Sequence, residues 1–252
     1  MQNPTRRNRN IGTSKQGHGQ QNRLTIPNPY DDPRLFYERL GAYDKEERNI
    51  NGHTFLFITE RNSRFLKHAC SVNDLEKMIS YIPSTDYGDL KLIVLRQPKR
   101  KESILSGVWG RLIYSYEFED DFYPAVILEA FEDNGKLKWP RGLGPDDQQE
   151  LLRLRGDGHS FIESKRGYTA LLEARNVRNT QLYRTLLHEF GHYVHYLKMV
   201  KAFNDDAANE EQREKEYLHL PKDVKEKFAH QYANKLREQL LQQNLIPFEP
   251  LT

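Results

Sequence analysis

The segment from residue 180 to residue 200 constrains the fold most, because its two sides have opposite character. Read as an α-helix, which advances about 100° per residue, it gathers its large apolar residues on one side. These residues are Leu182, Leu186, Phe190, Tyr193, Leu197 and Val200. The opposite side carries His188 and His192. We therefore predict a helix whose apolar side is buried and whose histidines face away from that side.

His188 and His192 belong to the pattern His-Glu-x-x-His. Two residues four apart differ by only about 40° around a helix and lie one turn apart, so both imidazoles can reach a single tetrahedral Zn²⁺. Glu189 lies about 100° round from His188, where it can activate a zinc-bound water without occupying a coordination position. We therefore predict that His188 and His192 are metal ligands and that Glu189 is the catalytic general base.

A catalytic zinc site needs a third protein ligand, and the last expected helix, which begins at Asp223, offers Glu226. Glu226 is the first residue of one face of this helix, the face expected to pack against the rest of the protein. The other residues of that face are Ala229, Ala233, Leu236 and Leu240. A carboxylate there is costly unless it is paired or coordinated, and the small alanines would let the helix press against Gly191. An alternative explanation for a glutamate at position 226 is that it forms a capping box with Asp223, three residues earlier. We predict Glu226 as the third ligand. The rival candidates are His219, His230 and Glu216.

His195 shares the histidine side of the 180–200 helix. It stands about 10 Å along the axis from His188, too far to share one ion on an unbroken helix. We expect it to line the cleft or to support a ligand rather than to coordinate. A donor that stabilises the oxyanion is also expected. The candidates, which the sequence does not rank, are Tyr193, Tyr217, Tyr232 and His219.

The chain has 252 residues and a single cysteine, Cys70. That count excludes an intrachain disulfide and any multi-cysteine metal site, so histidine and carboxylate are the available ligands. No run approaches the ~18 apolar residues of a membrane span. The basic residues near the start are not followed by the apolar stretch that a secretory leader would have. We expect a cytoplasmic protein with no membrane segment and with enough length to bury a sizeable core.

Residues 1–29 differ in composition from the rest of the chain. They are rich in Asn, Gln and Gly, and they contain basic residues but no acidic one. The basic residues are Arg6, Arg7, Arg9, Lys15 and Arg23. Such a segment cannot bury enough apolar surface to offset its ordering entropy, so we predict a disordered basic tail. Phosphate neutralisation would let this tail contact nucleic acid, although the signal is weak without interleaved aromatic residues.

Helix and strand signals alternate from residue 31 onward. The expected helices are 32–40, 145–154, 180–200 and one that starts at 223. A further helix is expected to begin at a capping box at Ser71 and to end before Pro83. The expected strands are 53–59, 90–95, 110–118, 123–131, 136–139, 160–163 and 168–172. The dipeptide Asn134-Gly135 predicts a hairpin that pairs 136–139 with the preceding strand. Either 111–118 or 126–131 is expected to form the edge that pairs with substrate.

The pairing of Leu187-His188-Glu189-Phe190-Gly191-His192 with the later Glu226-x-x-Ala229-x-x-Tyr232-Ala233 resembles the ImmA/IrrE-type zinc metallopeptidases. Their third ligand is the glutamate of a Glu-x-x-Ala-x-x-Phe-Ala helix, so the resemblance implies this role for Glu226. It also implies a minimal gluzincin core, in which a short sheet, an active-site helix and a glutamate helix pack together. The sequence departs from the family by reading Phe228-Ala229-His230 where the family has Glu-Ala-Asn.

These patterns predict an α+β fold. A zincin-like metallopeptidase core at residues 85–245 is expected to contain a short mixed sheet packed on an active-site helix and a C-terminal glutamate helix. Residues 30–84 are expected to form an N-terminal α/β extension of the same domain. The expected function is that of a zinc metalloendopeptidase that hydrolyses peptide bonds of a protein or peptide substrate.

Two other functions fit the same sequence. One is a catalytically silent zincin-fold regulatory or binding module, whose basic tail contacts nucleic acid or a protein partner. The other is a structural zinc protein with a closed coordination shell, in which a fourth protein ligand such as His195 or His219 takes the place of water. The substrate, the oligomeric state and the pathway are not specified by the sequence.

Overall fold

The computed structural model describes residues 34–35, 37–98, 109–203 and 207–251. The predicted basic tail at residues 1–29 therefore lies outside the described residues. Contacts divide the chain into two units, Met1–Phe36 and Tyr37–Thr252. Only Arg34 and Leu35 of the first unit are described, and everything below concerns the second. The second unit mixes helices and strands, which confirms the predicted α+β class at that level.

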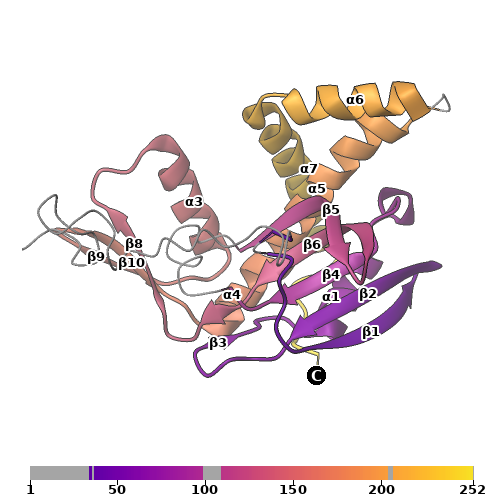
Figure 1. The fold of residues 1–252 in the computed structure, drawn as a ribbon. Helices are drawn as coiled ribbons and strands as arrows, with labels where there is room; N and C mark the ends of the chain where they lie inside the picture. The colour runs from indigo at the N-terminus through magenta and orange to yellow at the C-terminus, as the bar shows by residue number, and fades with distance from the viewer. Residues whose placement is uncertain (1–33, 36, 99–108, 204–206, 252) are drawn as a thin grey trace, which may run out of the picture. The chain divides into compact units, whose positions relative to one another are not determined.

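The elements of the second unit follow one another as Figure 1 shows. The strands are β1 (Tyr43–Ile50), β2 (His53–Glu60), β3 (Leu66–Lys67), β4 (Leu92–Arg96), β5 (Gly110–Phe118), β6 (Asp121–Glu129), β7 (Phe131–Glu132), β8 (Lys136–Pro140), β9 (Phe161–Ser164) and β10 (Gly167–Leu171). The helices are α1 (Val72–Ser80), the 3₁₀ turn η2 (Ser84–Asp86), α3 (Pro145–Gly156), α4 (Ala174–Thr180), the π-helical η3 (Gln181–Leu186), α5 (Leu187–Tyr196), the π-helical η4 (Leu197–Lys201), α6 (Ala207–His219) and α7 (Lys222–Gln242). None of these described helices is long and apolar enough to cross a membrane.

A five-stranded mixed sheet, ordered β1-β2-β4-β6-β5, forms the centre of the unit. The three inner strands are parallel, and the outer strands β1 and β5 pair antiparallel. Strand β4 reads as a continuous apolar run because both of its faces are buried, as is usual for inner parallel strands. Its Ile93 and Leu95 face the core that contains α1, α5 and α7, whereas Leu92 and Val94 face the opposite cluster with Tyr37.

Strand β5 is one of the two outer strands of this sheet. It is also one of the two strands that were expected to form an edge. Its pairing with β6 is interrupted by a β-bulge between Ile113 and Tyr116. Leu112 and Tyr114 pack on the helix side, whereas Ile113 before the bulge and Tyr116 after it pack on the opposite side. The extra residue therefore switches which positions of β5 face the helices.

The predicted 180–200 helix is confirmed, and it begins earlier than expected. Elements α4, η3, α5 and η4 follow one another without a break in helical backbone, from Ala174 to Lys201. The apolar stripe lies in the helix-side core, where Leu186 and Phe190 are fully buried. The His-Glu-x-x-His turn lies within the regular α-helical part, so the four-residue spacing keeps both histidines on one face.

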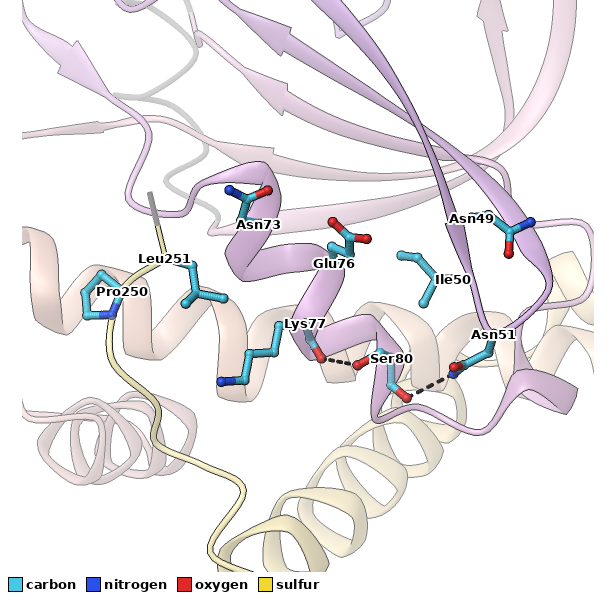
Figure 2. Close-up of a pocket in the computed structure, with 9 residues that line it drawn as sticks. All are labelled: Asn49, Ile50, Asn51, Asn73, Glu76, Lys77, Ser80, Pro250 and Leu251. Carbon is cyan, nitrogen blue, oxygen red and sulfur yellow. Dashed lines mark hydrogen bonds between the residues drawn. The ribbon is translucent and has the colours of Figure 1, made fainter.

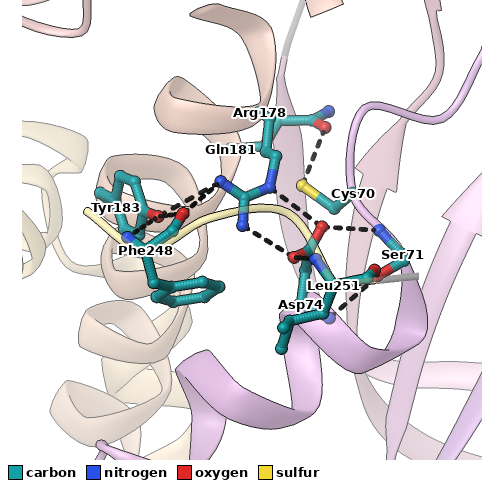
Figure 3. A network of polar contacts seen from close by, with 8 residues as sticks. All are labelled: Cys70, Ser71, Asp74, Arg178, Gln181, Tyr183, Phe248 and Leu251. Atoms are coloured by element: carbon teal, nitrogen blue, oxygen red, sulfur yellow. Dashed lines mark hydrogen bonds and ion pairs between the residues drawn. The ribbon is translucent and has the colours of Figure 1, made fainter. Parts of the chain in front are cut away.

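A buried ion pair joins α1 to α4 and to the last described residues (Figure 3). Ser71 and Asp74 form the predicted capping box at the start of α1. Asp74 also accepts hydrogen bonds from Arg178, at 2.7 and 3.0 Å, and from the backbone of Leu251 at 2.9 Å. The guanidinium of Arg178 donates further to the carbonyl of Phe248 at 3.1 Å. One carboxylate thus fastens three segments that are distant in sequence.

The strand at residues 136–139 forms as predicted, but its predicted partner is wrong. Strand β8 pairs with β10 in a separate three-stranded sheet, ordered β8-β10-β9, and not with β6. The chain first leaves β6 through β7, which pairs with β3. A turn that the N–H of Gly135 closes onto the carbonyl of Glu132 then redirects it. The hairpin dipeptide therefore joins β7 to a different sheet.

One further expectation for the chain needs correction, and one strand was not expected. The described residues of the expected 32–40 helix, Arg34–Leu35 and Tyr37–Leu40, form a bend and a turn and no helix. Strand β1 was not expected because its sequence, Tyr43–Ile50, is almost entirely charged or polar and exposed, as an outer strand can be. Residues 30–84 were expected to extend the core within one domain, either as a cap or as part of the sheet. Of their described part, β1 and β2 belong to the central sheet, and α1 belongs to its helix-side core.

Candidate metal centre

Helices α5 and α7 pack tightly where Gly191 faces Ala229. A Cβ atom added to Gly191 would lie 2.9 Å from both the Cα and the carbonyl oxygen of Ala229, and 3.2 Å from the Cβ of Tyr232. These distances leave no room for a side chain at residue 191. The expectation that small residues let the last helix press against Gly191 is therefore confirmed, and the contact brings the first turns of α7 beside His188 and His192.

Three of the predicted ligands meet between these helices. The Nε2 atoms of His188 and His192 are 3.0 Å apart. One carboxylate oxygen of Glu226, Oε2, lies 3.1 Å from the Nε2 of His188 and 3.7 Å from that of His192. The two histidines come from adjacent turns of α5, and Glu226 comes from the second turn of α7. The three atoms thus form a small triangle.

This triangle has the size that a zinc ion requires. Ligand atoms bound at ~2.1 Å in a tetrahedral arrangement are separated by about 3.4 Å. The three observed separations lie on either side of that value. The donor set also fits, because two imidazole nitrogens and one carboxylate oxygen are typical of catalytic zinc sites. The residues present therefore match the size and chemistry of a zinc centre.

The triangle is partly open to solvent. The side chains of His188 and His192 are 15% and 14% exposed, and that of Glu226 is 35% exposed. Hydrogen bonds from the two histidines hold the pKa of the Glu226 carboxyl well below its ordinary value, against the opposing effect of burial. Glu226 is therefore ionised at neutral pH, as a metal ligand must be.

Glu189 is buried beside this triangle, on the side of the edge strand. Its side chain is only 8% exposed, and this burial raises the pKa of the carboxyl while the neighbouring histidines lower it. A backbone hydrogen bond from Leu112 of β5 also lowers the pKa, which shows that the carboxylate touches the edge strand. A carboxylate with a raised pKa is a better proton acceptor at neutral pH.

His230 also belongs to this group, although the sequence offered it only as a rival to Glu226. Its ring centroid lies 4.3 Å from that of His188. One ligand atom each from His188, Glu226 and His230 lie within 4.8 Å of one another. Burial is the main cause that lowers the pKa of His230 to about 4, and the charge of His188 is the second. The structure therefore brings both Glu226 and His230 to the histidine pair.

The other two rivals make contacts elsewhere. The Nδ1 of His219 lies 2.6 Å from the backbone carbonyl of Lys215, one turn earlier in α6. Glu216 accepts a hydrogen bond from Gln212, also on α6. Both side chains belong to exposed residues on this helix. Neither joins the cluster of possible ligands that the described residues form.

His195 is packed among aromatic rings. Its ring stacks on Phe228, with centroids 4.3 Å apart, and meets Tyr217 edge to face. The residue is buried, and its Nδ1 has no hydrogen-bond partner among the described residues. His195 thus fills the space behind the histidine pair and anchors α7 to α5, in keeping with the expectation that it supports the site.

The hydroxyls of the candidate oxyanion donors are already engaged. Tyr193 accepts a hydrogen bond from the backbone of Asp89, and Tyr232 donates to Asp86. Tyr217 donates to the carbonyl of His192 at 3.3 Å and lies 3.0 Å from the hydroxyl of Tyr114. Tyr217 is therefore the candidate tyrosine nearest the histidine pair by these contacts.

Tyr114 was not recognised in the sequence as a residue of the site. It lies on β5, two positions beyond Leu112, and its ring packs against Tyr196 and Tyr217. Burial is the main cause that raises its pKa, and the charge of Glu189 adds to the effect. The alternation of an edge strand places residues 112 and 114 on one face, and this signal could have identified it.

A separate pocket lies between the β1–β2 turn, α1 and the last described residues (Figure 2). Its volume is about 610 Å³. Two of its side chains bond to nearby backbone: Asn51 donates to the carbonyl of Ser80, and the hydroxyl of Ser80 donates to the carbonyl of Lys77. Its described lining includes one carboxylate, that of Glu76, and no histidine, so it lacks the group of possible metal ligands found at the histidine site.

Comparisons with protein-family models, with curated proteins and with solved structures find no match for this chain.

Proposed function

We propose that this protein is a zinc-dependent endopeptidase. His188, His192 and Glu226 would hold the zinc ion, and Glu189 would act as the general base. One observation carries the proposal. Two imidazole nitrogens of α5 and a carboxylate oxygen of α7, whose residue lies 34 or more positions further along the chain, converge to within 3.0–3.7 Å beside a buried glutamate of the His-Glu-x-x-His pattern. The resemblance to ImmA/IrrE-type metallopeptidases supports the same function.

The chain's own residues would divide the work of hydrolysis. When bound, zinc lowers the pKa of a water molecule and polarises the carbonyl of the scissile bond. Glu189 would accept the proton of that water and pass it to the leaving amine. Burial of Glu189 favours this role, because it raises the pKa of the carboxyl. Leu112 would hold the carboxylate in place through its backbone hydrogen bond.

The edge strand β5 is suited to bind an extended peptide. Among the described strands, it pairs with β6 alone, which leaves its other edge without a strand. The N–H of Leu112 bonds to Glu189, and it therefore points to this outer edge. A peptide added along the edge would place its backbone beside Glu189, through main-chain hydrogen bonds that do not depend on side chains.

The test is to measure bound zinc and peptide hydrolysis in parallel. The unaltered chain should hold about one zinc ion per chain. His188→Ala and His192→Ala should each lower zinc occupancy and the double variant should lose the metal, whereas Glu189→Gln should keep it and lose hydrolysis because only the proton acceptor has gone. His219→Ala is the matched control, since that imidazole lies on α6 and should retain both properties. Full zinc occupancy in both His188→Ala and His192→Ala would overturn the proposal.

A further inference from the structure

The two helices of the site each contribute a pair of possible ligands. On α5 these are His188 and His192, and on α7 they are Glu226 and His230. Both pairs are four residues apart, so the members of each pair lie on one face of their helix, a turn apart. The packing of Gly191 against Ala229 turns these two faces toward each other. Four possible donor groups therefore lie between the two helices, and His188 contacts each of the other three, although a catalytic zinc site needs only three.

The ring of His230 lies as close to the ring of His188 as the ring of His192 does. The His230 ring centroid is 4.3 Å from that of His188, whereas the His188 and His192 centroids are 4.6 Å apart. Ligand atoms of His188, Glu226 and His230 lie within 4.8 Å of one another. Because the ligand atoms of one tetrahedral ion are about 3.4 Å apart, a side-chain movement on the order of 1 Å would give His230 that spacing from the ligand atoms of His188 and Glu226.

We propose that His230 is the fourth protein ligand of the zinc ion and closes its coordination shell in the resting protein. The inference rests on the proposed zinc site, and it adds a means of regulation to that site. A four-coordinate ion held by four residues has no position for water. Rotation of the His230 side chain would open that position without a change in the α7 backbone. A strong competing ligand would favour the open arrangement by binding only to it.

X-ray absorption at the zinc edge tests this directly, because it counts the imidazoles bound to the ion. The zinc-loaded full chain should show three imidazoles and His230→Ala should show two. Zinc affinity should fall in this variant by at least the ~10- to 100-fold that loss of a supporting residue costs. Addition of acetohydroxamate, a chelating zinc ligand, should reduce the count in the unaltered chain from three to two. His219→Ala should match the unaltered chain throughout.

Each outcome decides between the two proposals. A count of two imidazoles in the unaltered chain would overturn the role of His230 and leave the zinc site intact. Three imidazoles in both the unaltered chain and His230→Ala would also overturn it, since another histidine would then be the third. If His230→Ala does not fold, the count in the unaltered chain decides alone. A chain that binds no zinc, or that keeps it after loss of His188 and His192, would instead contradict the proposed function.

Discussion

At the scale of single residues, Gly191 determines whether the site can form. Glycine in a helix interior normally costs about 1 kcal/mol relative to alanine, so its presence needs a reason. The reason is the 2.9 Å separation between a Cβ atom at residue 191 and the backbone of Ala229. The same contact places Glu226 within 3.1 Å of His188. One missing methyl group thus links helix packing to the geometry of the ligands.

We predict that Gly191→Ala reverses the usual effect of this substitution. The added methyl group would push α7 away and lower the free energy of unfolding by about 1–3 kcal/mol, because the core there is already full. Zinc affinity should fall with it, since Glu226 moves with α7. Gly156→Ala is the matched control, because a Cβ atom at that helical residue meets nothing within 4 Å. Urea unfolding and zinc titration measure both effects. Equal stabilisation by the two substitutions would contradict the role of Gly191.

The residues of the motif were predictable, and those that support it were less so. His188, His192 and Glu189 are adjacent on one helix, so their spacing alone defines their relative positions. The placement of Glu226 needed the size of Ala229 as well. His230 entered only as a rival to Glu226, because a search for one third ligand does not anticipate a fourth donor. Tyr114 was missed because Leu112, from which the alternation leads to it, was not itself placed beside Glu189.

At the scale of elements, the buried pair of Asp74 and Arg178 holds α1 against α4. Burial by itself raises the pKa of the Asp74 carboxyl, but hydrogen bonds from Arg178, Leu251 and Ser71 outweigh this and hold the pKa below its ordinary value. A carboxyl whose pKa is lower in the folded than in the unfolded chain stabilises the fold above the unfolded pKa. This contribution disappears as the pH falls through the folded pKa.

We predict that Asp74→Asn removes part of the acid sensitivity of the fold. At neutral pH it should lower the free energy of unfolding by about 3–5 kcal/mol, because Arg178 is left buried without its charged partner. Below the unfolded pKa of about 3.9, the variant and the unaltered chain should converge. Unfolding measured across this pH range tests both statements. Asp133→Asn, which removes an exposed pair with Lys67, is the control and should change little. A constant difference between Asp74→Asn and the unaltered chain at all pH values would contradict the prediction.

The elements themselves were predictable where their residues alternate or run apolar. Strand β4 and helix α1 follow from a buried apolar run and a capping box. Strand β1 could not be found in this way, because an outer strand with charged residues on both faces carries no apolar pattern. The partner of β8 was also beyond local reasoning. The turn at Gly135 is a short-range feature, whereas the choice between β6 and β10 depends on contacts made later in the chain.

At the scale of the whole molecule, the proposed centre joins α5 to α7, which are separated along the chain by η4 and α6. Two histidines of α5 and a carboxylate of α7 meet because α5 packs on β5 of the central sheet and α7 packs on α5. The unfolded chain has no such arrangement, so it should bind zinc far more weakly than the folded chain. Metal binding and folding are then linked, and zinc should stabilise the entire fold and not only the two helices.

We therefore predict that removal of zinc lowers the melting temperature of the unaltered chain. A ligand that binds only the folded state adds about 4 kcal/mol when its free concentration is a thousand times its dissociation constant. A chelator should remove this increment, and added zinc should restore it. The double variant His188→Ala/His192→Ala should melt at one temperature under both conditions, because it removes both imidazoles of the motif, whereas His219→Ala should respond as the unaltered chain does. The measurement is thermal unfolding by circular dichroism with and without chelator. An equal response of the double variant would mean that zinc acts at a different place, because the same stabilisation would then arise without the histidine pair of α5.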